Sequence, residues 1–318
     1  MSEGMSIREY LGRLVGEPVY YCPNPGNAGD SAIAAATFQL FEEVGVRYHL
    51  VRWDEHVDLT GQVVIYGGGG NLIPLYVHGR TFIERHHRGA RRLIVLPHTV
   101  AGHDDLLAQL GTNVEIVCRE RRSYDHVRRR APRVNASLMH DMVFYLDPVR
   151  ILEGDHATLP RLVLISAARQ LRYGRFINRS KLVRSAFSSL RSRARFALSN
   201  SLTRNHDRKI LNSFRGDAEQ SAMDLPPRNI DVSAVFQLGT HTPELAFAVT
   251  RSVLRFLSRF EEINTNRLHV CMLSALLGKK VNFYPNSYFK CEAVYDYSIR
   301  DRFPNVRWVS GLRSAAKT

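Results

Sequence analysis

The stretch Val63-Val-Ile-Tyr-Gly-Gly-Gly-Gly-Asn71 decides how the chain folds. Its first four residues are β-branched or aromatic and predict a short buried strand. Four glycines follow at once, although a turn needs only one or two, and each costs about 1 kcal/mol in conformational entropy relative to alanine. We therefore expect this backbone to lie against a ligand or another segment of the chain. A substrate contact, shared by the Asn71 amide, is the interpretation we favour.

The same succession of strand, loop and helix recurs through most of the chain. Strands are expected at residues 18–22, 46–53, 63–66, 92–98, 114–118, 161–166, 231–237, 281–285 and 306–309. Helices are expected at residues 31–44, 75–88, 103–110, 243–259, 264–278 and 288–297. Such alternation is typical of an α/β fold, with helices on both faces of a parallel sheet and ligands at the carboxyl ends of the strands. Because the pattern restarts after residues 147–154, we divide the chain between residues 154 and 155.

A second informative stretch is Asn264-Thr-Asn-Arg-Leu-His-Val-Cys-Met-Leu-Ser-Ala-Leu-Leu-Gly278. An Asn or Thr at its start can cap a helix, and the final glycine can end it. Arg267 and His269 then lie in the first turn, and the remainder of the helix is apolar. Because a helix N-terminus favours anions, the two side chains predict a binding site for a phosphate or carboxylate. An arginine at a solvent-exposed helix start is the alternative.

The loop Asn24-Pro-Gly-Asn-Ala-Gly-Asp30 lies between a predicted strand and a predicted helix. Its glycines allow a ligand to approach the backbone closely, and the helix that follows presents its N-terminus. The spacing matches neither a P-loop nor a dinucleotide-binding G-x-G-x-x-G fingerprint. Asp30 is a candidate base at the carboxyl edge of the sheet, although a carboxylate at this position can also serve as a helix cap.

Polar residues follow two further predicted strands. His98 ends the strand at 92–98, and Arg119 and Ser123 lie where the next strand gives way to a helix. Such positions commonly face a ligand in a parallel sheet. A buried core histidine and a surface arginine are the alternatives. The thirteen histidines include no His-x-x-x-His pair with a third ligand, so we expect no metal site.

Length and composition indicate a globular protein. At 318 residues the chain is long enough for two domains, and 44% of its residues are hydrophobic. No apolar run approaches the roughly 20 residues of a membrane span. The first ten residues lack the apolar core of a signal peptide, so we expect a cytoplasmic protein. The four cysteines form no Cys-x-x-Cys pair and indicate free buried thiols.

The net charge of +14 is concentrated in one segment. Residues 169–209 contain ten arginines and two lysines against one aspartate, which leaves +3 for the remainder of the chain. Residues 177–198 combine apolar side chains with many arginines and predict an amphipathic helix, so 177–209 can lie on an anionic membrane surface. Polyanionic glycan binding and a solvated basic helix are the alternatives. Nucleic acid is not expected, because aromatic residues are not interleaved with the basic ones and no reader motif occurs.

Taken in order, these motifs resemble the polysaccharide pyruvyl transferase family over roughly residues 18–166 and 230–297. The motifs that carry the likeness are Asn24-Pro-Gly-Asn-Ala-Gly-Asp30, Tyr66-Gly-Gly-Gly-Gly-Asn71-Leu72, Leu96-Pro-His98, Cys118-Arg-Glu-Arg-Arg-Ser123, His140-Asp141, and Arg267-Leu-His269 with Ala275-Leu-Leu-Gly278. Two features depart from the family pattern. His98 stands where the family often has a glutamine, and segment 169–209 has no clear counterpart.

The resemblance implies two Rossmann-like domains that face each other across a cleft, similar to the GT-B glycosyltransferase architecture. Residues 1–154 would form the acceptor side and residues 155–318 the donor side, with a basic helical insertion at 169–225. It also implies that pyruvate moves from phosphoenolpyruvate, without a further cofactor, to a sugar of an exopolysaccharide or cell-surface glycan precursor, forming a pyruvate ketal. A lipid-linked oligosaccharide acceptor would place the protein peripherally on the inner face of the cell membrane.

Within that reaction, roles are assigned residue by residue. His269 is the expected acid or base, and Asp30 is expected to activate an acceptor hydroxyl. The donor is expected to contact Arg267, Asn266 and Lys290. The acceptor side or the cleft is expected to include Asn27, Gly29, Gly67, Gly68, Gly69, Gly70, Asn71, His98, Arg119 and Ser123. The alternative functions are a GT-B-type glycosyltransferase that uses a nucleotide sugar and a non-enzymatic glycan- or lipid-binding protein.

Overall fold

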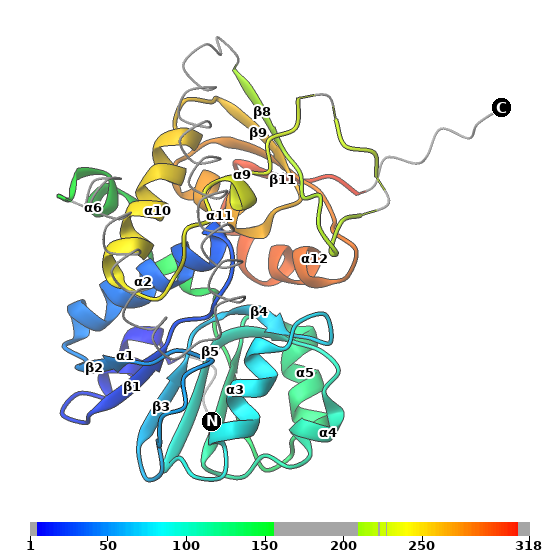
Figure 1. The fold of residues 1–318 in the computed structure, drawn as a ribbon. Coiled ribbons are helices and arrows are strands. Elements are labelled where there is room, and N and C mark those ends of the chain that lie inside the picture. Colours follow the sequence, from blue (N-terminus) through cyan, green and yellow to red (C-terminus); the bar gives the residue numbers. More distant parts are fainter. Residues whose placement is uncertain (1–4, 156–208, 222, 227, 311–318) are drawn as a thin grey trace, which may run out of the picture.

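The computed structural model describes residues 5–155 and 209–310, except residues 222 and 227. Over these residues the chain forms an α/β fold with two parallel sheets, one from each end of the sequence (Figure 1). The strand predicted at 161–166 and most of the basic segment, up to residue 208, lie outside the described residues. The division predicted between residues 154 and 155 adjoins that gap and stays a prediction.

The N-terminal sheet has the order β2-β1-β3-β5-β6-β7 among the described residues, with β4 paired to the end of β5, and every pair is parallel. Its strands are β1 (Val19–Cys22), β2 (Tyr48–Leu50), β3 (Val63–Tyr66), β4 (Gly69–Leu72), β5 (Arg92–Val100), β6 (Val114–Cys118) and β7 (Asn135–Leu138). The accompanying helices are α1 (Ile7–Gly12), α2 (Ala28–Val44), α3 (His78–His86), α4 (Asp104–Leu107), α5 (Arg121–Arg130), the 3-10 helix η1 (Met142–Tyr145) and α6 (Pro148–Glu153). The sheet therefore presents the carboxyl ends of all its strands at one edge.

The second sheet has the order β11-β10-β9-β8 within the described residues and is also parallel throughout. Its strands are β8 (Ile210–Ser213), β9 (Glu262–Thr265), β10 (Lys280–Phe283) and β11 (Val306–Trp308). The accompanying helices are α9 (Val232–Val235), α10 (Pro243–Leu257), α11 (Leu268–Leu276), α12 (Lys290–Val294) and the π-helix η3 (Tyr295–Ile299). In the described part of the chain, every helix is too short or too polar to cross a lipid bilayer.

Three elements differ from the sequence predictions. The strand predicted at 231–237 is instead the short helix α9, because the Asp231 carboxylate accepts the Ala234 N–H and caps a helical turn. Strand β8 lies within the segment 169–225 that was predicted to be a helical insertion. The helix predicted from residue 264 begins at Leu268, because Asn264 and Thr265 pair with β8 as part of β9.

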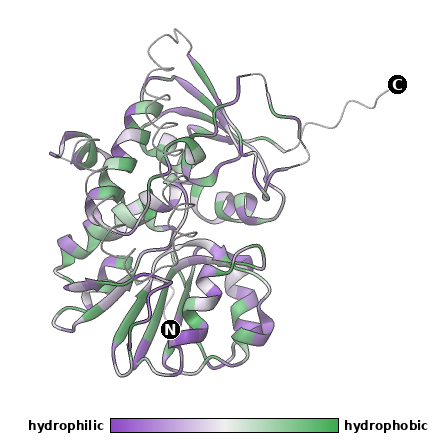
Figure 2. Cartoon of the chain, viewed as in Figure 1, coloured by the Kyte–Doolittle hydropathy of each residue, from purple (hydrophilic) through white to green (hydrophobic). Residues whose placement is uncertain are grey.

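One large hydrophobic core joins the two sheets. It includes Val63 of the first sheet, Val281 of the second, and the helices α2 and α10, which pack against each other between them. Phe38 of α2 and Phe247 of α10 meet edge to face, with ring centroids 6.2 Å apart. A second core fills the other face of the N-terminal sheet, and Figure 2 shows this sheet's hydrophobic strands beside helices with more hydrophilic residues. Buried side chains on both faces are typical of parallel strands.

Candidate functional site

A pocket with a volume of about 140 Å³ lies where the carboxyl ends of the two sheets meet. It is lined by residues that follow β1, β4 and β6 in the first sheet and β8, β9 and β10 in the second. The predicted site residues among them are Asn27, Asp30, Gly70, Asn71, Arg119, Arg267, His269 and Lys290. Segments as far apart in the sequence as Asn27 and Lys290, 263 residues, therefore contribute to one site, as expected for the carboxyl edges of parallel sheets.

The N-terminus of α2 forms one wall of the pocket. Asn27 caps the helix by accepting the Gly29 N–H at 2.8 Å, and Asp30 accepts the Asn27 N–H at 2.9 Å. Asp30 also accepts a hydrogen bond from the Asn24 side chain at 3.0 Å. Desolvation raises the pKa of the Asp30 carboxyl, although the nearby His269 opposes that shift. A carboxyl group with a raised pKa takes up a proton more readily than an ordinary carboxylate.

His269, in the first turn of α11, lines the same pocket. A Cβ atom on Gly29 would overlap the imidazole, so the close approach of α2 to His269 requires glycine at that position. The imidazole Nε2 lies 3.5 Å from the buried Asp141 carboxylate, which also accepts a hydrogen bond from Arg119 at 2.7 Å. Although burial opposes it, the contacts with His269 and Arg119 hold the pKa of Asp141 well below its usual range. Asp141 is thus a buried anion that orients two pocket side chains, His269 and Arg119.

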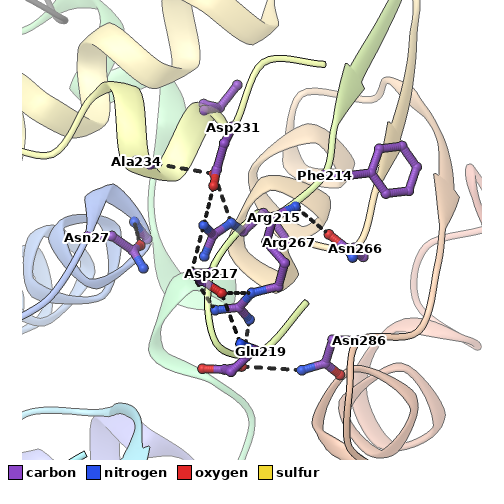
Figure 3. Close-up of polar contacts among 12 residues, drawn as sticks. Asn27, Phe214, Arg215, Asp217, Glu219, Asp231, Ala234, Asn266, Arg267 and Asn286 are labelled. Carbon is purple, nitrogen blue, oxygen red and sulfur yellow. Dashed lines mark hydrogen bonds and ion pairs between the residues drawn. The ribbon is translucent and has the colours of Figure 1, made fainter. Parts of the chain in front are cut away.

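Arg267 is held by two carboxylates beside the pocket (Figure 3). Asp231 binds both Nε and Nη2 of the guanidinium, and Asp217 Oδ2 lies 2.9 Å from Nη2. Asp217 in turn forms a bidentate contact with Arg215, at 2.7 and 3.0 Å. The two arginine side chains are nearly buried, whereas 42% of the Asp217 side chain is exposed. The two guanidinium groups therefore share one accessible carboxylate.

Glu219 is the common partner of the other cations on this side. It forms an ion pair with Lys290 and accepts a hydrogen bond from Arg215 at 2.5 Å. Tyr76, from the loop after β4, donates to the same carboxylate at 2.6 Å, so the contact joins the two sides of the pocket. Burial lowers the pKa of the Lys290 ammonium, and Glu219 opposes that shift. The lysine and its counter-ion thus behave as one buried pair.

The four-glycine run mostly packs against the protein itself. A Cβ atom on Gly67 would come within 2.7 Å of the Asn24 backbone nitrogen, and one on Gly68 within 2.9 Å of the Pro97 carbonyl. Gly69 has a φ of 153° and faces the Asn24 side chain. Gly70 is the member of the run that lines the pocket, next to Arg119. Close packing of chain segments therefore accounts for the first three glycines, and the substrate contact that we favoured for the run stays a prediction.

Three other predicted residues lie behind the pocket wall. His98 is fully buried, and its Nε2 accepts the Asn71 N–H at 3.2 Å. Ser123 bonds to Glu120 at the start of α5 and accepts the Val100 N–H at 2.8 Å. Asn266 accepts the Arg215 N–H at 2.8 Å. Each of these three side chains bonds to the protein through at least one polar group and so supports the site, and the ligand contacts predicted for them stay a prediction.

Sequence reasoning missed Arg215, Asp217, Glu219, Asp231 and Asp141 as members of the site. The alternation Arg215-Gly-Asp217-Ala-Glu219 was the available signal, because it places charges of both signs close together directly after a strand. We overlooked this alternation because it lies close to the arginine-rich segment 169–209.

The pocket offers free hydrogen-bond donors to an anion. Within the part of the chain that the structure describes, Nη2 of Arg119 and Nη1 of Arg267 have no hydrogen-bond acceptor. Lys290 and His269 add two further nitrogen groups to the lining of the same pocket. Among the described residues, no cluster of three or more His, Cys, Asp or Glu could hold a metal ion. The arrangement is suited to a small oxyanion bound by nitrogen donors.

The described residues form an α/β fold with a charged pocket, rich in Arg, Lys and His side chains, between the carboxyl ends of two parallel sheets. The chain belongs to the polysaccharide pyruvyl transferase family, whose sequence pattern matches residues 27–288, and it is therefore a transferase. It is 23% identical over 313 residues to a protein of Bacillus subtilis (strain 168) named "Putative pyruvyl transferase EpsO", covering 90% of this chain and 86% of that protein. A crystal structure of the uncharacterized protein KP1_0663 from Klebsiella pneumoniae subsp. pneumoniae NTUH-K2044 is similar, with a TM-score of 0.70 and 29% identity over 96% of this chain and 97% of that one.

Proposed function

We propose that the protein transfers pyruvate from phosphoenolpyruvate to two hydroxyl groups of one sugar in an exopolysaccharide or cell-surface glycan precursor, forming a pyruvate ketal. The observation that carries the proposal is a single pocket lined both by nitrogen groups, those of Arg119, Arg267, His269 and Lys290, and by the Asp30 carboxyl. Phosphoenolpyruvate carries a phosphate and a carboxylate, and Arg267, Arg119 and Lys290 would bind these groups. No further cofactor is included in the proposal.

The reaction needs a proton donor and a proton acceptor on opposite sides of the double bond of phosphoenolpyruvate. His269 would protonate the terminal enol carbon while one sugar hydroxyl adds to the central carbon and gives its proton to Asp30. The oxygen of the second hydroxyl then bonds to the same carbon as the C–O bond to phosphate breaks, and the hydroxyl proton leaves with inorganic phosphate. Asp141 would stabilise the imidazolium form of His269, because its carboxylate faces the imidazole Nε2.

We also propose the GT-B-like arrangement, with the N-terminal sheet on the acceptor side, because both sheets direct their carboxyl ends toward the pocket. The shared core of α2 and α10 makes the two halves more tightly joined than that comparison suggests.

Release of inorganic phosphate from phosphoenolpyruvate, measured with a panel of acceptor glycans, tests the function. We expect acceptor-dependent release by the wild-type chain and a loss of at least about 100-fold in kcat for His269→Ala. His49→Ala is the matched control, because His49 is exposed on β2, away from the pocket. Unchanged kcat in His269→Ala would remove this residue from the mechanism. Thermal stabilisation by nucleotide sugars but not by phosphoenolpyruvate would favour the glycosyltransferase alternative.

A peripheral position on the inner face of the cell membrane is part of the proposal, since precursors of surface glycans are commonly linked to lipids. It rests on the basic composition of residues 177–209, of which the structure describes only Lys209. Co-sedimentation of the full chain with anionic vesicles, at low and high salt, tests it. Absence of salt-sensitive binding would exclude the membrane surface as a partner.

A further inference from the structure

The Arg215–Asp217–Arg267 cluster has a geometry that the proposed reaction does not yet use. Oδ2 of Asp217 lies 3.0 Å from Nη2 of Arg215 and 2.9 Å from Nη2 of Arg267. One carboxylate oxygen thus bridges two guanidinium groups, and both arginines line the pocket. A phosphate oxygen makes the same bridging contact with paired arginines. Asp217 therefore takes the position that an anionic group of a ligand would take.

If the Asp217 carboxylate were absent, each arginine would still contact another carboxylate. Arg267 retains the two contacts of its Nε and Nη2 with Asp231, and Arg215 retains Glu219 at 2.5 Å. Both guanidinium groups would therefore stay oriented without Asp217. Asp217 is also the most exposed of the three carboxylates, at 42% against 20% for Asp231 and 3% for Glu219. Of the three carboxylates, it is therefore the one whose replacement by an incoming anion would disturb the buried charges least.

Charge balance leads to the same conclusion. Arg215, Arg267 and Lys290 face three carboxylates, so the cluster is neutral with Asp217 in place. Without Asp217 it carries one net positive charge and presents the Nε and Nη2 edge of Arg215. We infer that Arg215 and Arg267 form a clamp for the phosphate group of the donor, and that the Asp217 carboxylate competes with this group for the clamp. The inference rests on the proposed function, which it extends by naming Arg215 as a donor-binding residue and Asp217 as an internal competitor.

Calorimetric titration of the full chain with inorganic phosphate tests the clamp. Asp217→Asn keeps the size of the side chain and removes its charge, and we expect it to bind phosphate about tenfold more tightly than the wild type. The control is Asp224→Asn, which makes the same charge change at an exposed position of the same loop and should alter the affinity less than about twofold. The double variant Asp217→Asn/Arg215→Gln should lose the gain.

The outcomes separate the clamp from the reaction. Equal phosphate affinity in Asp217→Asn and the wild type would overturn the clamp, even if the wild type converts phosphoenolpyruvate. A gain for pyruvate in place of phosphate would overturn the assignment to the phosphate group. A tenfold gain for phosphate together with no turnover of phosphoenolpyruvate would support the clamp and refute the proposed function. If Asp217→Asn does not fold, Asp217→Ser removes the same charge and is titrated in its place, with the same expected gain.

Discussion

Replacing His98 with glutamine is expected to make the protein more resistant to acid. The imidazole is fully buried beside Arg119, and burial, with a smaller effect of Arg119, lowers the pKa of His98 from its usual 6.5 to about 3. The folded protein therefore keeps His98 neutral over a range of pH in which the unfolded chain binds a proton there. Between these two pKa values the free energy of unfolding falls as the pH is lowered.

The size of this loss in the free energy of unfolding depends on how far the pH lies below the pKa of His98 in the unfolded chain. One pH unit corresponds to about 1.4 kcal/mol, so at about pH 5 the buried His98 lowers the free energy of unfolding by about 2 kcal/mol relative to about pH 7. Glutamine does not titrate, and its amide oxygen can accept the Asn71 N–H that Nε2 accepts at 3.2 Å. The His98→Gln variant should therefore lose about 2 kcal/mol less than the wild type over this interval.

Urea denaturation at about pH 7 and about pH 5 measures the difference directly. The control is His49→Gln, which changes an exposed histidine on β2 and should leave the wild-type pH dependence intact. If His98→Gln and the wild type lose the same free energy on acidification, His98 must be protonated in the folded protein. Its burial would then not have the effect on its pKa that we derive.

Two further predictions concern the groups around the pocket. Gly29→Ala places a methyl group against His269. The resulting displacement of the imidazole should lower kcat about 100-fold in the phosphate-release assay. Unchanged kcat would show that the position of the imidazole is not critical. Asp141→Asn leaves the buried Arg119 guanidinium without its counter-ion and should lower the free energy of unfolding by about 3 kcal/mol in urea. The exposed ion pair of Asp104 is the comparison, and Asp104→Asn should cost less than about 1 kcal/mol. Equal losses in the two aspartate variants would contradict the role of Asp141 as a buried counter-ion.

Much of the fold and part of the pocket could be predicted from the sequence, because their signals are local. Short β-branched runs followed by glycine or polar residues predict parallel strands, and β1, β3, β5 and β6 begin within one residue of the expected positions. Arg267 and His269 stand out because cationic residues open an otherwise apolar helix, and the structure places both at the pocket. Asp30 and Arg119 follow strands and also reach it, since parallel strands align their carboxyl ends.

The remainder depends on contacts between distant segments. Asp217 meets Arg267 across 50 residues of sequence, and no spacing rule relates two such positions. The glycine run shows a different limit. A backbone that must pass close to Asn24 and Pro97 needs the same residues as a backbone that must pass close to a ligand, so the sequence cannot distinguish the two. The short helix α9 depends on the capping contact of Asp231, which an apolar run of strand-forming residues does not reveal.

The packing of α2 against α10 has a consequence for how ligands reach the pocket. In many two-lobed enzymes the lobes swing apart to admit substrate and close again around it. Here such a swing would separate Phe38 from Phe247 and expose the core that both sheets share. We therefore expect a ligand to enter through smaller movements, for example of the loop that carries the exposed Asp217 side chain.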